Sequence, residues 1–167
     1  NLLGGVPALW RVVLDRMANE PALGDVREAL RREFPEAHRE GELSAAIGDY
    51  CLAVFARDVP SSTSAYRRLE ECDMDESRLR LLLHTGPKAI LAADKLAELV
   101  ARREPTAYFG DIFPSTVVSL VAERVSEDAG ALDYLRELLD DPTALLSHAF
   151  PASVLHAART GWRPTGR

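Results

Sequence analysis

The segment from Asp75 to Pro105 constrains the fold more than any other part of the chain. It reads DESRLRLLLHTGPKAILAADKLAELVARREP, two runs with apolar residues at helical spacing that meet at Gly86 and Pro87. A proline suits the first turn of a helix, and Pro105 prevents the second run from continuing. The pattern therefore predicts two helices separated by a short break.

Proline and glycine divide the rest of the chain into further short segments of helical periodicity. Helices are expected at Pro7–Asn19, after a cap at Asp25, at Leu43–Phe55, at Ala65–Cys72 behind a loop at Asp58–Ser64, after a cap at Asp73, around Val117–Val125, at Ala131–Asp140 and from Pro151. The valines near Val117 also suit a strand, but no partner strand is visible. We therefore predict an all-α fold, a compact orthogonal bundle of roughly eight or nine short helices.

The length of the chain suits one domain. The 167 residues are enough to bury a substantial core, and no linker or shift in composition divides them. We expect a single helical domain over residues 1–160 and a frayed C-terminal tail over 161–167. Because the chain lacks an initiator methionine, we also expect it to be part of a larger protein.

Composition and charge exclude several classes of protein. A hydrophobic content of 47% and a charged content of 28% are typical of a soluble globular protein. The net charge of −6 disfavours a general nucleic-acid-binding surface, and no segment is long and apolar enough to span a membrane. The two cysteines, Cys51 and Cys72, lie outside any metal-binding spacing, so we expect buried thiols and a cytoplasmic location.

Motifs for catalysis or metal binding are missing from the sequence. There is no HExxH, GxSxG or phosphate-binding loop, and none of the four histidines has a partner at metal-ligand spacing. Adjacent carboxylates lie near helix ends, where the helix dipole favours them. We therefore predict no catalytic residues, no metal site and no cofactor. An unrecognised enzyme or cofactor site near His84 remains an alternative.

The first candidate site is a basic ridge made of Lys88, Lys95 and Arg102. At 100° per residue these three side chains fall within about 40° of one another on one helix face. Lys88 lies in the first turn, where the helix dipole disfavours a cation. The ridge predicts either a site for phosphate or an acidic partner, or a solvated face on which Glu98 and Arg102 form an ion pair.

The same segment carries a short resemblance to a known motif. Residues Thr85–Leu96 are similar to the second half of the helix–hairpin–helix motif of DNA-binding proteins, whose turn offers backbone amides to a phosphate. His84 stands where that motif has its first glycine, and Ile90 stands where it has a small residue. The resemblance implies phosphate binding as an alternative function and does not assign a family.

The second candidate site consists of three aromatic residues close together in the sequence, Tyr108, Phe109 and Phe113. Exposed aromatic residues would form a hot spot for a protein partner, whereas buried ones would anchor a loop to the core. Both alternatives remain open from the sequence.

The sequence thus favours a non-enzymatic helical domain for protein–protein interaction or regulation. Its expected partner is another protein or a further domain of the same polypeptide, and a second copy of the chain is a further candidate. Nucleic acid is a less favoured partner, and no membrane is expected. A nucleic-acid or phosphate-binding module that uses the basic ridge is the alternative.

Overall fold

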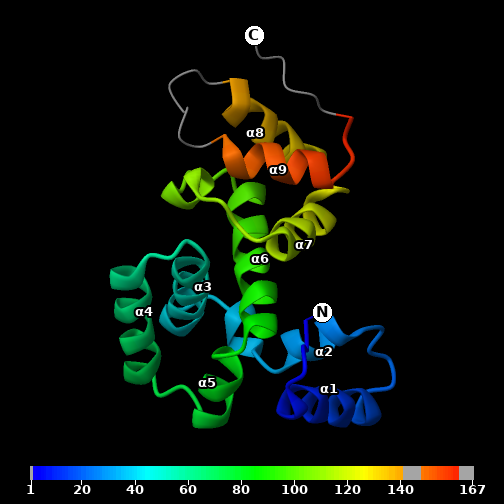
Figure 1. Cartoon of the computed structure of the whole chain (residues 1–167), viewed down its shortest axis with the longest axis vertical. Coiled ribbons are helices and arrows are strands. Elements are labelled where there is room, and N and C mark those ends of the chain that lie inside the picture. The colour runs from blue at the N-terminus through cyan, green and yellow to red at the C-terminus, as the bar shows by residue number, and fades with distance from the viewer. Residues whose placement is uncertain (1, 141–147, 162–167) are drawn as a thin grey trace. The chain divides into compact units, whose positions relative to one another are not determined.

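The computed structural model describes residues 2–140 and 148–161, and within these ranges it contains nine α-helices and no strand (Figure 1). The predicted all-α, multi-helix class is therefore confirmed. In chain order the elements are α1 (Pro7–Asn19), α2 (Val26–Arg32), η1 (Pro35–His38), α3 (Glu42–Phe55), α4 (Val59–Glu71), α5 (Glu76–Leu82), α6 (Thr85–Ala101), η2 (Ala107–Gly110), α7 (Ser115–Val125), α8 (Ala129–Asp140) and α9 (Ala149–Ala157), where η marks a 3-10 helix. None of the described helices is long and apolar enough to cross a membrane. Apart from Gly161, the expected tail lies outside the described residues.

The residues cluster into two compact units. Unit 1 comprises Asn1–Val54 and Asp58–Leu91, and unit 2 comprises Phe55–Arg57 and Ala92–Arg167. Helix α6 contributes its first residues to unit 1 and the remainder to unit 2. The expected single domain over residues 1–160 stays a prediction.

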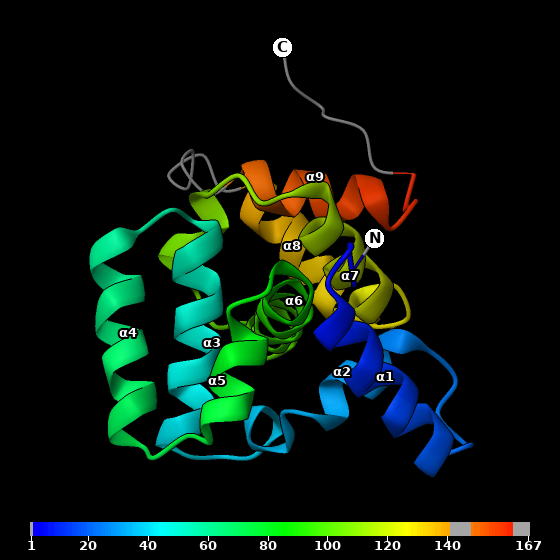
Figure 2. The ribbon, with the colours of Figure 1, turned by 60° about the horizontal axis from the view of Figure 1, so that its bottom comes forward.

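Unit 1 is built from antiparallel neighbours around a buried apolar core. Helix α1 packs on α2, and α3 lies beside α4 in both views (Figures 1 and 2). The α3–α4 pair is fixed by the rings of Tyr50 and Tyr66, whose centroids are 5.6 Å apart, and by an ion pair of 2.7 Å between Arg68 and Asp49. The apolar stripe of α3 is buried at Ile47, Tyr50 and Cys51.

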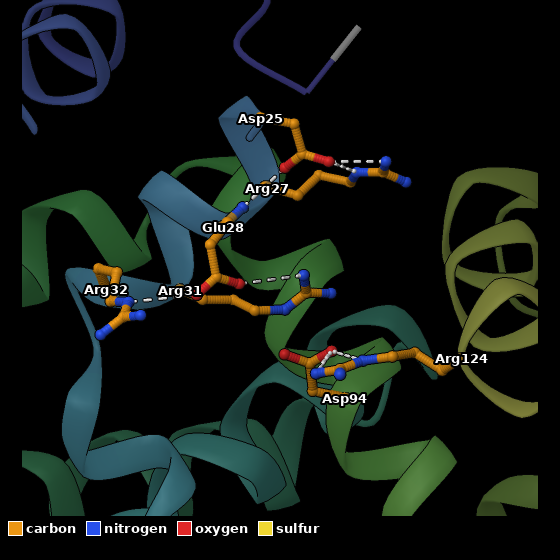
Figure 3. Close-up of polar contacts among 7 residues, drawn as sticks. All are labelled: Asp25, Arg27, Glu28, Arg31, Arg32, Asp94 and Arg124. Atoms are coloured by element: carbon orange, nitrogen blue, oxygen red, sulfur yellow. Dashed lines mark hydrogen bonds and ion pairs between the residues drawn. The ribbon is translucent and has the colours of Figure 1, made fainter. Parts of the chain in front are cut away.

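Unit 2 is organised around α9, which packs on α7, α8 and η2. The β-branched segment is helical, and Val117, Val121 and Val125 are buried on one face of α7. The same helix is tied to α6 by Arg124, whose guanidinium lies 2.8 Å from a carboxylate oxygen of Asp94 (Figure 3). The Asp94 side chain is only 9% exposed, so its carboxylate is shielded from solvent, whereas the Arg124 side chain is 44% exposed.

Among the described helices, α2, α4, α5 and α8 begin with an aspartate cap, the last through Asp128, which accepts the Ala131 amide at 3.0 Å. Asp25 accepts the Glu28 amide at 2.9 Å and is also paired with Arg27 (Figure 3). Asp58 accepts the Ser61 amide at 3.1 Å, and Asp75 accepts the Ser77 amide at 3.0 Å. Each carboxylate satisfies backbone donors that the first turn leaves without a partner.

Two sequence predictions about these caps were wrong. The expected loop at Asp58–Ser64 is the first part of α4, because Pro60 fits the first turn, where its missing N–H is not needed. The serine and threonine hydroxyls that suggested a loop instead donate to Asp58 or to the Val59 carbonyl. The cap of α5 is Asp75 rather than Asp73, which has a φ of 55° just after α4.

The carboxylates that cap these helices should make the stability of the protein fall in acid. Hydrogen bonds from Arg78 and Ser77 lower the pKa of Asp75, and those from Ser61 lower the pKa of Asp58. Partial burial acts to raise the pKa of Asp25, but the Glu28 amide and Arg27 outweigh it and the pKa is lowered. A carboxylate with a lowered folded-state pKa stabilises the fold above its unfolded pKa, about 3.9, and this contribution is lost as the pH falls further.

The Asp75→Asn variant tests this expectation, because asparagine caps a helix but does not titrate. The midpoint of urea unfolding should fall less below pH ~4 in this variant than in the wild type. Asp73→Asn, which removes a neighbouring carboxylate that caps no helix, is the matched control. An acid loss of equal size in both variants would contradict the assignment.

Gly86 is required by a close approach of the N-terminal segment. A Cβ atom at this position would lie 1.8 Å from the Leu2 carbonyl oxygen, far inside contact distance. The sequence predicted a helix break at Gly86 and Pro87, and α6 instead begins at Thr85, one residue before the glycine. The glycine therefore lies inside the helix, where it leaves room for another segment of unit 1.

Candidate functional site

The basic ridge lies on α6 as the helical spacing predicted, but its three cations have different surroundings. Lys95 Nζ is 3.1 Å from Glu98 Oε2, and Arg102 Nη2 is 2.9 Å from Glu98 Oε1. Two of the three cations therefore share one carboxylate, and the ion pair expected for a solvated face is present. Phosphate binding by this ridge stays a prediction.

Lys88 differs from the other two residues of the ridge. Its ammonium group lies 6.0 Å from the centre of the Tyr50 ring, a cation–π arrangement, and its side chain is partly buried. Burial lowers the pKa of the Lys88 ammonium group, while the neighbouring Cys51 acts in the opposite direction. Burial also raises the pKa of the Cys51 thiol, so this cysteine stays neutral.

The aromatic candidates separate into buried and partly exposed residues. Phe109 and Phe113 are buried at 1% and 6% exposure, whereas Tyr108 is intermediate. The Phe109 ring stacks on Phe150 with centroids 5.4 Å apart and meets the edge of Tyr134 at 6.4 Å. Phe113 lies 5.6 Å from the same Phe150 ring. This arrangement supports the anchor alternative for the two phenylalanines, because other residues of unit 2 pack against both rings.

Neither His84 nor any cluster of potential metal ligands forms a recognisable site in the described part of the chain. The histidine side chain is partly buried at the end of α5, and its backbone carbonyl accepts the Lys88 amide at 3.4 Å. Within residues 2–140 and 148–161, no group of three or more histidine, cysteine, aspartate or glutamate side chains is placed to hold a metal ion. Carboxylates near α2 form ion pairs with arginines. For example, Glu28 Oε1 lies 3.1 Å from Arg32 Nε (Figure 3).

An exposed apolar face on α1 was not foreseen from the sequence. Leu9 and Val13 are buried, but Trp10 and Leu14 are 43% and 58% exposed on another side of the helix. At 100° per residue, Pro7, Trp10, Leu14 and Ala18 fall within an arc of about 80°, and all four are exposed. We call these four residues the α1 face.

The geometry of the α1 face is well defined. The Trp10 indole N–H donates to the Gly4 carbonyl at 3.3 Å, which holds the ring against the helix start. Beside the α1 face, Arg11 and Asp15 form an ion pair at 3.8 Å, so their charges neutralise each other. The sequence signal for this face was a second apolar stripe on a helix whose first stripe already supplied the core.

Comparison with known proteins adds no functional residue. No protein family model, curated protein or solved structure matches the chain. The functional argument therefore depends on the chain's own side chains and their surroundings.

Proposed function

We propose that this chain is a helical interaction domain whose docking surface is the α1 face and whose partner is an amphipathic helix of another protein or domain. The observation that carries the proposal is the exposure of Trp10 and Leu14, one helical turn apart, on a helix that already buries its other apolar stripe. Exposed large apolar residues that occur together are typical of interaction sites, and tryptophan is enriched at binding hot spots.

The kind of partner that would bind follows from the shape and charge of the α1 face. Side chains at spacings of three and four residues form a ridge that fits the groove of a second helix. The charges of Arg11 and Asp15, which flank the α1 face, cancel each other. This lack of net charge favours an apolar partner surface over nucleic acid. The basic ridge on α6 supports a charged partner less well, because Glu98 pairs with both Lys95 and Arg102.

A cytoplasmic location is part of this proposal. Its support is the state of the two cysteines, Cys51 and Cys72, which are free thiols. Free thiols are typical of a reducing compartment.

The test uses a display library of amphipathic helical peptides, selected against the wild-type chain. A selected peptide should bind the Trp10→Ser/Leu14→Ser variant more weakly by at least ~2 kcal/mol, roughly 30-fold in Kd, because the variant lacks the hot-spot side chains. The Ile112→Ser variant is the matched control, since Ile112 is 86% exposed and stands outside the α1 face. Binding would be measured by calorimetric titration.

Two outcomes separate the alternatives. Light scattering could show a concentration-dependent dimer that is lost in the double variant. In that case the partner of the α1 face would be a second copy of the chain. Peptides that bind the double variant and the wild type equally would overturn the α1 face as the docking surface. Circular dichroism should show both variants folded, because exposed substitutions usually change stability by no more than about 0.5 kcal/mol.

A further inference from the structure

The only two lysines of the chain occupy contrasting environments. Lys95 is held by Glu98 at 3.1 Å. Lys88 forms no ion pair with any carboxylate in the part of the chain that the structure describes, and its ammonium group lies over the Tyr50 ring instead. One lysine is thus paired with a carboxylate, and within the described residues the other is not.

The groups beside Lys88 are mostly uncharged at neutral pH. Helix α3 contributes Tyr50, which is 8% exposed, and the fully buried Cys51. The Tyr50 ring in turn lies 5.6 Å from the Tyr66 ring of α4, measured between ring centroids. Just before α6, His84 precedes Lys88 by four residues, and its backbone carbonyl accepts the Lys88 amide.

Three physical effects act on the Lys88 amine. Partial burial disfavours the charged form, and the first turn of α6 adds the positive end of the helix dipole. The Tyr50 ring acts in the opposite direction, since an aromatic face attracts a cation. Burial, opposed by the neighbouring Cys51, lowers the pKa of Lys88. More of this amine is therefore neutral and nucleophilic at neutral pH than in an ordinary exposed lysine.

We propose that Lys88 is a site of Nε-acylation that reacts with small activated acyl donors, thioesters or acyl phosphates, in preference to Lys95. The lone pair of the neutral amine attacks the acyl carbon, and a C–N bond forms. The bond from that carbon to the sulfur or phosphate oxygen breaks, and the leaving group takes its electron pair. The nitrogen loses one proton to water, and a leaving thiolate takes one proton from water, so the products are an amide and a thiol or a phosphate, with no change of oxidation state.

Acylation has a clear consequence for the surroundings of Lys88. The amide is neutral, so the partly buried position over Tyr50 no longer holds an unpaired charge. The basic ridge loses the one cation that Glu98 does not contact. The proposal does not depend on the α1 face, because it concerns other residues and another chemistry.

The experiment treats the full chain at neutral pH with acetyl-coenzyme A in one arm and acetyl phosphate in the other. Peptide mass spectrometry gives the initial acetylation rate at each lysine. In the folded chain Lys88 should react several-fold faster than Lys95, and in urea, where both lysines are exposed, the two rates should become similar. Reaction in one arm alone would identify the class of donor.

Two variants make the test specific. Lys88→Arg should remove the fast modification and leave that of Lys95 unchanged. Glu98→Gln releases Lys95 from its ion pair and should raise the Lys95 rate without changing that of Lys88. A folded chain in which Lys95 reacts as fast as Lys88, or in which folding slows Lys88 in both arms, would overturn the proposal.

Discussion

Replacing Phe109 by alanine should lower the free energy of unfolding by about 3–5 kcal/mol. The phenylalanine is 1% exposed and its ring is enclosed by Phe150 and Tyr134, so alanine would leave a cavity between η2, α8 and α9. The loss combines the transfer free energy of the ring with the cost of that cavity and of two aromatic contacts. Urea unfolding followed by circular dichroism measures the change.

The matched control is Ile112→Ala, three residues away in the same segment. Ile112 is 86% exposed, so its truncation should change stability by no more than about 0.5 kcal/mol. This pair of variants also distinguishes the two alternatives for the aromatic segment. If Phe109→Ala were as stable as Ile112→Ala, Phe109 would be no anchor of unit 2.

Gly86→Ala should destabilise the protein by about 1–3 kcal/mol, although alanine favours a helix. The added methyl group would lie 1.8 Å from the Leu2 carbonyl oxygen, a backbone atom that cannot rotate away. Either α6 or the N-terminal segment must move, and the next residue of that segment, Leu3, is buried at 2% exposure. The midpoint of urea unfolding gives the loss of stability.

The control for this prediction is Gly24→Ala. No atom lies within 4 Å of a Cβ placed at Gly24, and its φ is not positive, so alanine there should be neutral or mildly stabilising. Limited proteolysis of Gly86→Ala adds a second measurement, because displacement of the N-terminal segment should speed cleavage near Leu2. Equal stability of the two glycine variants would show that the close approach carries no energetic cost.

The sequence predicted helix positions well where periodicity and caps agreed. Pro7–Asn19 has the predicted bounds, and the Asp25 cap is present. The prediction failed at Asp58–Ser64, because loop and helix-start signals use the same residues, proline, serine and aspartate. Asp73 and Asp75 show the same limit, since two aspartates separated by one residue can both satisfy a cap rule and only the backbone geometry selects one.

The candidate surfaces depended more on tertiary structure. The spacing of Lys88, Lys95 and Arg102 predicted a shared helix face, but it contained no information on Tyr50, which comes from α3 and makes Lys88 different. The aromatic spacing left anchor and hot spot open, and the choice depends on Phe150 in α9. The α1 face was hidden because a second apolar stripe looks like additional core until the packing of α1 is known.

The sequence alone determined the all-α class, most helix positions and the break near Gly86, because these follow from interactions within a few residues along the chain. Only the tertiary structure decided which apolar residues remain exposed, which of the two lysines pairs with a carboxylate among the described residues and why residue 86 is a glycine. Those properties depend on contacts between segments far apart in sequence, such as Leu2 with Gly86 and Tyr50 with Lys88. Periodicity identifies the faces of a helix, but burial of a face requires a neighbour that periodicity does not specify.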